Sequence, residues 1–264
     1  MMITRGFSLT NFAIGTSALC FQIFVLYPWH QRLDNDFKEL KEEHLRGTPV
    51  VLITTENEDS TFNITPMSSA FWLGNRCMLG LRGISQTTIN LLRTQQCVLN
   101  LPSDRMSDAV NALARTTSSK EILTTQPDEG YKYFKRMNGY EYVQDKFGRA
   151  RLTPVKSDIV SLARIAECPA QMEAELVGVY EMAQDADTKG FFTLEVKVIR
   201  THVHKEIRME GWKNRIDPDK WRPMIMSFQE LYGLKGKLAG ESVLARIEEE
   251  EYRGFSNSIE IEKS

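Results

Sequence analysis

The stretch Asn63-Ile-Thr-Pro-Met-Ser-Ser-Ala-Phe-Trp72 decides how the rest of the chain is interpreted. It carries a proline and two serines where a buried strand usually has valine or isoleucine. Proline cannot donate a hydrogen bond to a neighbouring strand, so Pro66 indicates a sheet edge, a bulge, or a place where something other than a strand lies alongside. Two interpretations are open. The stretch is an irregular edge strand, or its small Ser68, Ser69 and Ala70 let a flat ring lie against the backbone.

The segments around this stretch predict a mainly β fold. Residues 49–55, 77–81 and 97–101 are apolar runs that are typical of buried strands. Residues 169–182 and 191–200 alternate apolar and polar side chains, which predicts a long antiparallel hairpin. Regular alternation of strands and helices stops after residue 115, so a parallel doubly wound sheet is not expected. We predict a β-barrel with peripheral helices, three of them at 85–94, 104–115 and 129–137.

Twelve residues separate Trp72 from Ser85, which is the predicted N-cap of the first helix. Its buried side is predicted to contain Ile89, Leu91 and Leu92. The start of a helix presents unpaired N–H groups and a positive dipole end, so it can bind an anion such as phosphate. Thr87 and Thr88 add hydroxyl groups there. The alternative is that Ser85 is only a cap and the threonines are surface residues.

Composition limits the classes of function. The chain has 264 residues, 26% of them charged, and a formal net charge of −2. Lysine and arginine form no basic stripe, which argues against a nucleic-acid-binding groove. The four cysteines form no C-x-x-C motif and suggest no disulfide framework, which indicates a reducing compartment.

The chain is predicted to have three parts: an N-terminal segment and linker (1–44), a central domain (45–235) and a charged tail (236–264). Residues 6–28 lack charges and are long enough to span a bilayer, but their polar residues weaken that signal. A signal anchor, an amphipathic lead-in and a poorly defined start of the reading frame all stay open. The only N-glycosylation sequon begins at Asn63, where a glycan would disrupt a buried site, so a cytoplasmic location is favoured.

Familiar catalytic motifs are absent from the sequence. It has no G-x-S-x-G elbow, no Walker loop and no G-x-G-x-x-G fingerprint. His202 and His204 would point to the same side of a strand, but only Glu206 lies near them in the sequence as a further ligand. We therefore predict no metal site.

The order of the motifs resembles the flavin reductase-like family of FMN-binding split β-barrels, across about residues 45–235. The motifs that carry this resemblance are Asn63-Ile-Thr-Pro-Met-Ser-Ser-Ala-Phe-Trp-Leu-Gly74, Cys77-Met-Leu-Gly-Leu81, Ser85-Gln-Thr-Thr-Ile-Asn-Leu-Leu-Arg-Thr94, Cys97-Val-Leu-Asn-Leu-Pro-Ser103, Ala166-Glu-Cys-Pro-Ala-Gln-Met-Glu-Ala174 and Trp221-Arg-Pro-Met-Ile-Met-Ser-Phe-Gln-Glu-Leu-Tyr-Gly233.

The resemblance implies a homodimer with FMN near the subunit interface. The segment from Pro66 to Ser69 would run along the isoalloxazine ring, and the helix start would hold the phosphate. Related proteins often carry Lys or Arg where Gln86 stands, so Arg82 or Arg93 would assist the helix end. The implied cofactor-binding residues are Asn63, Thr65, Pro66, Met67, Ser68, Ser69, Ser85, Gln86, Thr87, Thr88 and Asn90.

The function implied by the resemblance is hydride transfer from NADH or NADPH to flavin, with reduced flavin passed on to a partner oxygenase or another electron acceptor. The flavin carries this chemistry, so no catalytic side chain is expected. Two alternatives remain: a non-catalytic FMN-binding electron carrier on the same fold, and a membrane-tethered interaction protein.

Overall fold

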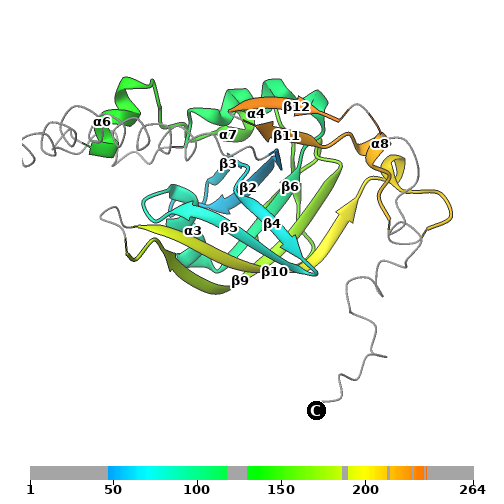
Figure 1. Ribbon diagram of the computed structural model, residues 1–264, viewed down its shortest axis with the longest axis horizontal. Coiled ribbons are helices and arrows are strands. Elements are labelled where there is room, and N and C mark those ends of the chain that lie inside the picture. The colour runs from blue at the N-terminus through cyan, green and yellow to red at the C-terminus, as the bar shows by residue number, and fades with distance from the viewer. Residues whose placement is uncertain are drawn as a thin grey trace, which may run out of the picture. The chain divides into compact units, whose positions relative to one another are not determined.

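The computed structural model describes residues 47–117, 130–185, 190–212, 215–227, 229–234 and 236 (Figure 1). These residues all belong to one compact unit, Gly47–Ser264. The predicted N-terminal segment and all of the predicted tail except Gly236 lie outside the described residues. Within the described ranges, no helix combines the length and the apolar character needed to cross a membrane.

Strands dominate the described part of the chain. They are β1 (Thr48–Pro49), β2 (Val51–Glu56), β3 (Phe62–Met67), β4 (Ala70–Leu73), β5 (Arg76–Arg82), β6 (Gln96–Leu101), β7 (Pro154–Lys156), β8 (Ala163–Ile165), β9 (Ala170–Met182), β10 (Phe191–Val203), β11 (Met224–Ser227) and β12 (Glu230–Gly233). The helices are α3 (Gln86–Thr94), α4 (Ser107–Ala114), α6 (Gly130–Met137), α7 (Lys146–Ala150), α8 (Pro218–Trp221) and the 3₁₀ turns η2 (Asp104–Met106) and η3 (Lys205–Ile207). The mainly β prediction is confirmed.

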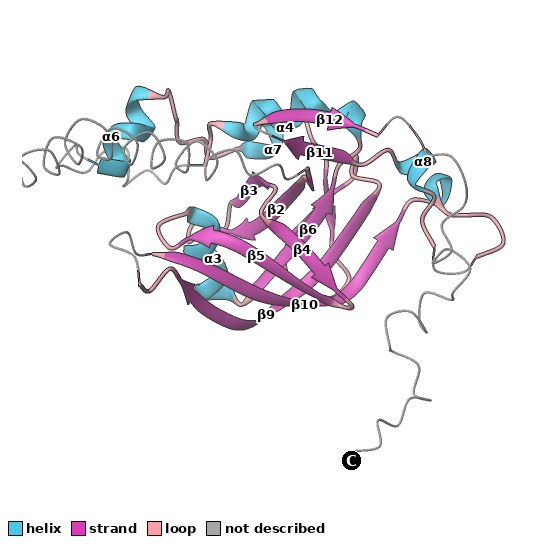
Figure 2. Cartoon of the chain, in the orientation of Figure 1, coloured by secondary structure: helices cyan, strands magenta, loops and turns pink. Residues whose placement is uncertain are grey.

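The largest sheet is antiparallel and has seven strands in the order β3-β2-β6-β9-β10-β5-β4 (Figure 2). Its edge strands, β3 and β4, are consecutive in the chain and are joined only by Ser68 and Ser69. Two linking residues keep the Cα atoms of Met67 and Ala70 within about 11 Å of each other. The sheet must therefore curl until its edges meet, so residues 67–70 form the seam of a barrel.

The sequence predicts a single strand in the stretch 63–72. The structure instead has the end of β3, a two-residue link and the start of β4 there. Pro66 lies on an edge strand, which is one of the three possibilities that the sequence left open, and it pairs with Leu52 of β2 on one side only. Gly74 has φ of 62° in the turn between β4 and β5, a conformation that glycine adopts without strain.

The long hairpin of β9 and β10 is confirmed by twelve aligned pairs, from Met182 opposite Phe191 to Ala170 opposite Val203. Two register shifts lie within it, after Glu195 and after Val198. Its connecting residues 186–189 lie outside the described part. The motif 221–233 contains the two strands β11 and β12, and the short helix α7 was not predicted.

Two apolar clusters lie on opposite faces of the barrel wall. The inner cluster includes Ile53, Leu79, Leu99 and Leu194. The outer cluster joins β2 and β3 to α4 and α7, and its members include Leu52, Ile64, Val110, Leu113 and Phe147. The buried cysteines Cys77, Cys97 and Cys168 are free thiols.

Helix α3 confirms the prediction that Leu91 is buried and corrects the rest of the predicted buried side. Ile89 and Leu92 are exposed, whereas Thr87, Thr88, Asn90 and Leu91 are buried. The helix therefore packs a mainly polar face onto β2 and β3. The reason lies in those strands, which offer buried hydroxyl and amide groups as partners.

Candidate functional site

The barrel seam brings small residues into close contact. The backbone N–H of Gly80 on β5 donates to the carbonyl of Ser69 at 2.8 Å, and Ser69 Oγ donates to the Gly80 carbonyl at 2.8 Å. A Cβ atom on Gly80 would lie 3.3 Å from the Ser69 Cβ. Ser68 Oγ lies 3.5 Å from Met226 Sδ on β11. The small side chain of Ser69 and the absence of one at Gly80 therefore let the two backbones lie close together, so this part of the barrel wall is thin.

The start of α3 has the features of an anion-binding helix end. Ser85 is the N-cap, and its Oγ accepts from the Thr88 N–H at 3.2 Å. Its carbonyl accepts from the Ile89 N–H at 3.1 Å. The N–H groups of Gln86 and Thr87 belong to the first turn, where a helix offers no acceptor of its own. The first turn contains no acidic residue that would repel an anion.

A buried hydrogen-bond network joins α3 to the strand that leads into the seam. Thr87 Oγ1 donates to Thr65 Oγ1 at 2.8 Å and accepts from Asn63 Nδ2 at 3.0 Å. Asn90 Nδ2 donates to Thr55 Oγ1 at 3.1 Å and to Asn57 Oδ1 at 2.9 Å. Buried polar groups with satisfied partners allow few alternative packings. The network thus fixes the helix start relative to residues 63–69.

Lys146 completes this network from α7 and was not predicted from the sequence. Its ammonium group donates to Asn63 Oδ1 at 2.6 Å and to the Ile64 carbonyl at 3.2 Å. Its side chain is buried, and burial together with the charge of Lys135 lowers the pKa of Lys146 to about 7. Nothing local in the 145–150 sequence marks this lysine, because the contact spans 83 positions of the chain.

The predicted cofactor-binding residues divide into two groups. The side chains of Asn63, Thr65, Thr87, Thr88 and Asn90 are buried and bonded within the protein. Six others reach the surface at least in part: Pro66, Met67, Ser68, Ser69, Ser85 and Gln86. Gln86 Nε2 donates to Asn90 Oδ1 at 2.8 Å. The first group can position a ligand-binding surface, and the second group can contact a ligand.

The two arginines expected to assist the helix start are placed differently. Arg82 lies three residues before Ser85, and its guanidinium stacks over the Phe191 ring at 4.5 Å. Arg93 lies in the last turn of α3 and donates to the Glu56 carbonyl. Because α3 has nine residues, Arg93 is about 10 Å along the helix axis from its start. Arg93 therefore serves the opposite end of the helix.

His202 and His204 lie near the other end of β10. His202 Nε2 lies 2.6 Å from the carboxylate of Glu173, whose oxygens also accept from the N–H groups of Asp158, Ile159 and Val160. The ligand atoms of Asp158, Glu173 and His202 lie within 4.8 Å of one another. The carboxylate oxygens of Glu173 already accept hydrogen bonds from N–H donors. Asp158 pairs with Arg200, with nitrogen and oxygen 3.1 Å apart. These side chains therefore have protein partners in place of an ion.

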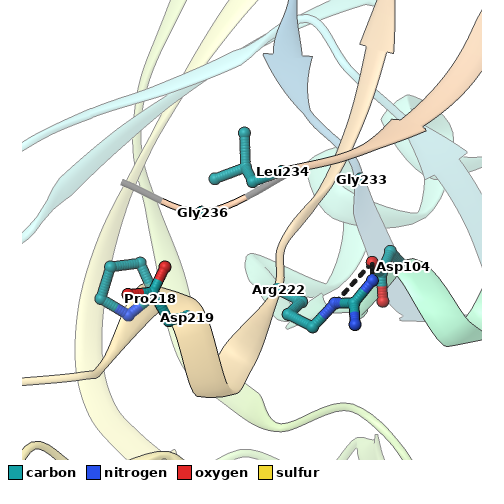
Figure 3. A pocket seen from close by; sticks show the side chains of 7 residues that line it. All are labelled: Asp104, Pro218, Asp219, Arg222, Gly233, Leu234 and Gly236. Atoms are coloured by element: carbon teal, nitrogen blue, oxygen red, sulfur yellow. Dashed lines mark hydrogen bonds and ion pairs between the residues drawn. The ribbon is translucent and has the colours of Figure 1, made fainter. Parts of the chain in front are cut away.

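A separate hollow of about 520 Å³ lies between η2, α8 and the end of β12 (Figure 3). Arg222 and Asp104 form an ion pair across one side of it, with nitrogen and oxygen 2.7 Å apart. Asp219 also lines this hollow, and none of the predicted cofactor-binding residues does. Two carboxylates make it a poor place for a phosphate group.

The curled antiparallel sheet, with a helix start fixed beside its seam, defines a split β-barrel of the flavin reductase class. The family described as "Flavin reductase like domain" matches residues 45–218, and the chain belongs to this family. The family and the fold predicted from the sequence are thereby confirmed.

Individual relatives agree with this assignment. The chain is 34% identical over 207 residues to the uncharacterized protein YdfE of Bacillus subtilis (strain 168), covering 78% of this chain and 93% of YdfE. The flavoredoxin structure of Desulfovibrio vulgaris (Miyazaki F) has 18% identity and a TM-score of 0.59, covering 77% of this chain and 96% of that one. Nitrilotriacetate monooxygenase component B from Bacillus cereus has 17% identity and a TM-score of 0.58, covering 77% and 92%. At these identities the two structures show a shared fold.

Proposed function

We propose that this protein is an FMN-dependent oxidoreductase that uses NADH or NADPH, with residues 45–235 as its flavin-binding domain. The family assignment supports a flavin as the cofactor. The observation that carries the proposal is the hydrogen-bonded connection from Thr87 to Thr65 and Asn63, at 2.8 and 3.0 Å. It fixes an anion-binding helix start beside the thin seam, which suits a ligand with both a phosphate group and a flat ring.

The residues at this site fit FMN by their chemistry. Ser85, Gln86 and the first-turn N–H groups would hold the phosphate, since they offer donors and no negative charge. The segment from Pro66 to Ser69 would lie along the ring. The buried groups of Asn63, Thr65, Thr88 and Asn90 would keep these two parts aligned. Bound FMN would supply the redox chemistry by accepting a hydride from the nicotinamide.

The second candidate is a flavin-carrying protein that has no nicotinamide activity of its own. The likeness to a flavoredoxin structure supports it, as does the absence of any requirement for a catalytic side chain. The likeness to a monooxygenase component B supports a different arrangement, in which reduced flavin passes to a partner oxygenase. A cytoplasmic location stays a prediction from the sequence.

Spectroscopy of the purified full-length protein tests the proposal. We expect flavin absorbance bands, either as purified or after FMN is added, and a dissociation constant can be measured from quenching of flavin fluorescence. A protein that remains colourless and does not bind added FMN would contradict both candidate functions.

Anaerobic reduction then separates the two candidates. An oxidoreductase loses its flavin absorbance when NADH or NADPH is added without oxygen. If neither nucleotide bleaches the flavin, whereas dithionite does, the carrier function is favoured. The nucleotide that bleaches faster at equal concentration identifies the preferred donor.

A further inference from the structure

A second polar hollow, of about 450 Å³, lies on the outer face of the barrel. Its lining includes Arg200 and His202 of β10, His204 just after that strand, Arg208, Gln171 of β9 and Arg164 of β8. Alternate residues of a strand point to the same side, which places Arg200 and His202 together, with His204 continuing the pattern. The volume is within the range of small-molecule binding sites.

The positive charge of this hollow is only partly compensated. Asp158 pairs with Arg200, with nitrogen and oxygen 3.1 Å apart. Arg164 donates only to neutral acceptors, namely Gln171 Oε1 at 2.8 Å and the Lys156 carbonyl at 2.9 Å. Its Nε–H is buried and has no hydrogen-bond acceptor. Arg208 makes no ion pair or side-chain hydrogen bond with any residue that the structure describes. Two permanently charged guanidinium groups therefore lack a carboxylate.

The carboxylate of Glu173, which contacts His202 of the hollow, is already fully engaged. Glu173 is buried, and its oxygens accept from three consecutive backbone N–H groups, of Asp158, Ile159 and Val160, at 2.7 to 3.0 Å. His202 holds the same carboxylate at 2.6 Å. With those bonds in place, Glu173 has little capacity left to pair with Arg164 or Arg208.

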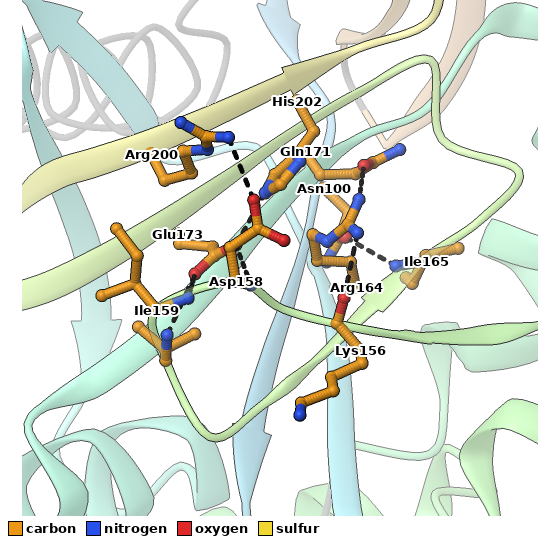
Figure 4. Close-up of polar contacts among 11 residues, drawn as sticks. Asn100, Lys156, Asp158, Ile159, Arg164, Ile165, Gln171, Glu173, Arg200 and His202 are labelled. Atoms are coloured by element: carbon orange, nitrogen blue, oxygen red, sulfur yellow. Dashed lines mark hydrogen bonds and ion pairs between the residues drawn. The ribbon is translucent and has the colours of Figure 1, made fainter.

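Several side chains of the hollow are held in position before any ligand arrives (Figure 4). Arg164 is held by Gln171 and by the Lys156 carbonyl, and His202 is held by Glu173. Gln171 itself donates to the Cys168 carbonyl. Side chains fixed in this way lose little conformational freedom when a ligand binds, which favours affinity.

We propose that this hollow binds a small oxyanion, a ligand with a phosphate or carboxylate group, between Arg164 and Arg208. Guanidinium groups match the paired oxygens of both anions. The site is distinct from the proposed flavin site. Phe191 pairs with Arg82, three residues before Ser85, whereas His202 lies eleven residues further along β10. That is about 35 Å along the strand.

The experiment is a calorimetric titration of the full-length protein with inorganic phosphate and, separately, with succinate at low ionic strength. Four variants are compared with the native protein: Arg208→Gln, Arg164→Gln, Arg149→Gln and Ser85→Ala. Arg208 is exposed, so its substitution should leave the fold intact, which far-ultraviolet circular dichroism checks. Arg149 is the matched control, because it is an exposed arginine of α7 that pairs with Glu141 away from the hollow.

We expect binding of at least one of the two anions, weakened at least about tenfold by Arg208→Gln and by Arg164→Gln. Arg149→Gln should bind as the native protein does, and in Ser85→Ala the binding that depends on Arg208 should remain. Binding of phosphate alone or of succinate alone identifies the natural anion class, and either result supports the site. Three results would overturn it: no binding of either anion, equal affinity in native protein and Arg208→Gln, or a loss confined to Ser85→Ala, which would place the phosphate at α3. The first and second results would leave the proposed flavin function untouched.

Discussion

Ser85 and Gln86 are the side chains at the start of α3 that reach the surface, where they also bond to Thr88 and Asn90, whereas Thr87 is fully buried in the network beneath them. This difference decides which substitutions report on cofactor binding. A Thr87 substitution removes hydrogen bonds to Asn63 and Thr65 and alters the core. Substitutions at Ser85 and Gln86 change the donors and the charge near the helix start.

Two substitutions should change FMN affinity in opposite directions. Ser85→Ala removes a hydroxyl and the N-cap, and we expect FMN to bind about tenfold more weakly, with a loss of about 1 kcal/mol in unfolding free energy. Gln86→Lys keeps a donor for Asn90 Oδ1 and adds a positive charge, so we expect FMN to bind about three- to tenfold more tightly. Flavin fluorescence titration measures both.

The matched control for the added charge is Gln95→Lys at the C-cap of the same helix, which should leave FMN affinity unchanged. Unchanged affinity in both Ser85→Ala and Gln86→Lys would show that the phosphate binds elsewhere.

Lys146 should make stability depend on pH in the alkaline range. The pKa of Lys146 is lowered to about 7 in the folded protein from an ordinary value of 10.5, first by burial and then by the charge of Lys135. Between those values the unfolded chain binds more protons, so the unfolding free energy contributed by Lys146 rises as pH increases from about 7 to 10.5. Below pH 7 Lys146 is charged in both the folded and the unfolded chain, so burial of its charge lowers the unfolding free energy by its full amount.

Urea unfolding of Lys146→Met at several pH values tests this expectation. The stability of the native protein relative to the variant should increase as pH rises from about 7 towards 10. The exposed Lys197→Met variant should show no such trend. A constant difference between native protein and Lys146→Met across this range would contradict it.

At the scale of elements, β7, β8 and the loop between them are attached to the outside of the barrel by side chains of β6 and β9. Asn100 Oδ1 of β6 accepts from the Ile165 N–H at 2.9 Å. Glu173 of β9 accepts from three consecutive N–H groups of the loop (Figure 4). This arrangement holds one wall of the proposed anion site.

Glu173→Gln should loosen that loop. Burial by itself raises the pKa of a carboxyl group, but the three N–H donors and His202 outweigh it and lower the pKa of Glu173 to about 2, from 4.5. The stability from this group is therefore complete above about pH 4.5 and is lost as pH falls towards 2. The amide of a glutamine would turn its own NH₂ group towards the backbone N–H donors. Glu173→Gln should therefore lower the unfolding free energy by about 2 to 4 kcal/mol.

Hydrogen exchange measures the effect locally. The amides of Asp158, Ile159 and Val160 should exchange faster in Glu173→Gln, and the acid-dependent loss of stability between pH 4.5 and 2 should shrink. Glu175→Gln, an exposed position on the same strand, is the control. Exchange as slow as in the native protein would contradict this role for Glu173.

At the scale of the whole molecule, the barrel leaves an apolar surface on α3 and β9. Leu92 is 43% exposed, and Val177 and Val179 are 47% and 44% exposed. The two elements adjoin, since the Leu176 N–H donates to the Gln95 carbonyl at 2.9 Å. Adjacent apolar side chains of this kind are typical of a subunit interface. They support the homodimer implied by the family resemblance.

A charge on this surface should separate the subunits. We expect the native protein to sediment as a dimer, and Leu92→Lys or Val177→Glu to shift the mass towards that of a monomer, because the charge would be buried unpaired at the interface. Tyr232→Lys, which alters an exposed aromatic residue of β12, should leave the mass unchanged. A native protein that sediments as a monomer at micromolar concentration would contradict the proposal.

Local sequence patterns were enough to predict the mainly β class, the long hairpin and the exclusion of Pro66 from a regular interior strand. These follow from local chemistry: side-chain alternation has the period of a strand, and proline lacks the N–H that an interior strand needs. The order of motifs was also sufficient to identify the family. The hairpin and proline signals are each contained within a few dozen consecutive residues, and the order of the motifs is a property of the linear chain.

How those parts pack together became clear from the folded structure. It showed that residues 63–72 span two strands at a barrel seam, because sheet closure depends on all seven strands. It exposed Ile89 and Leu92 of α3 and buried Thr87 and Asn90 beside Leu91, since the buried partners of Thr87 and Asn90 lie more than twenty positions earlier in the chain. It also placed Lys146 against Asn63, and Arg164 beside Gln171 and Arg200. Contacts between distant residues leave no periodic pattern in a single sequence, so they become visible only when the chain is folded.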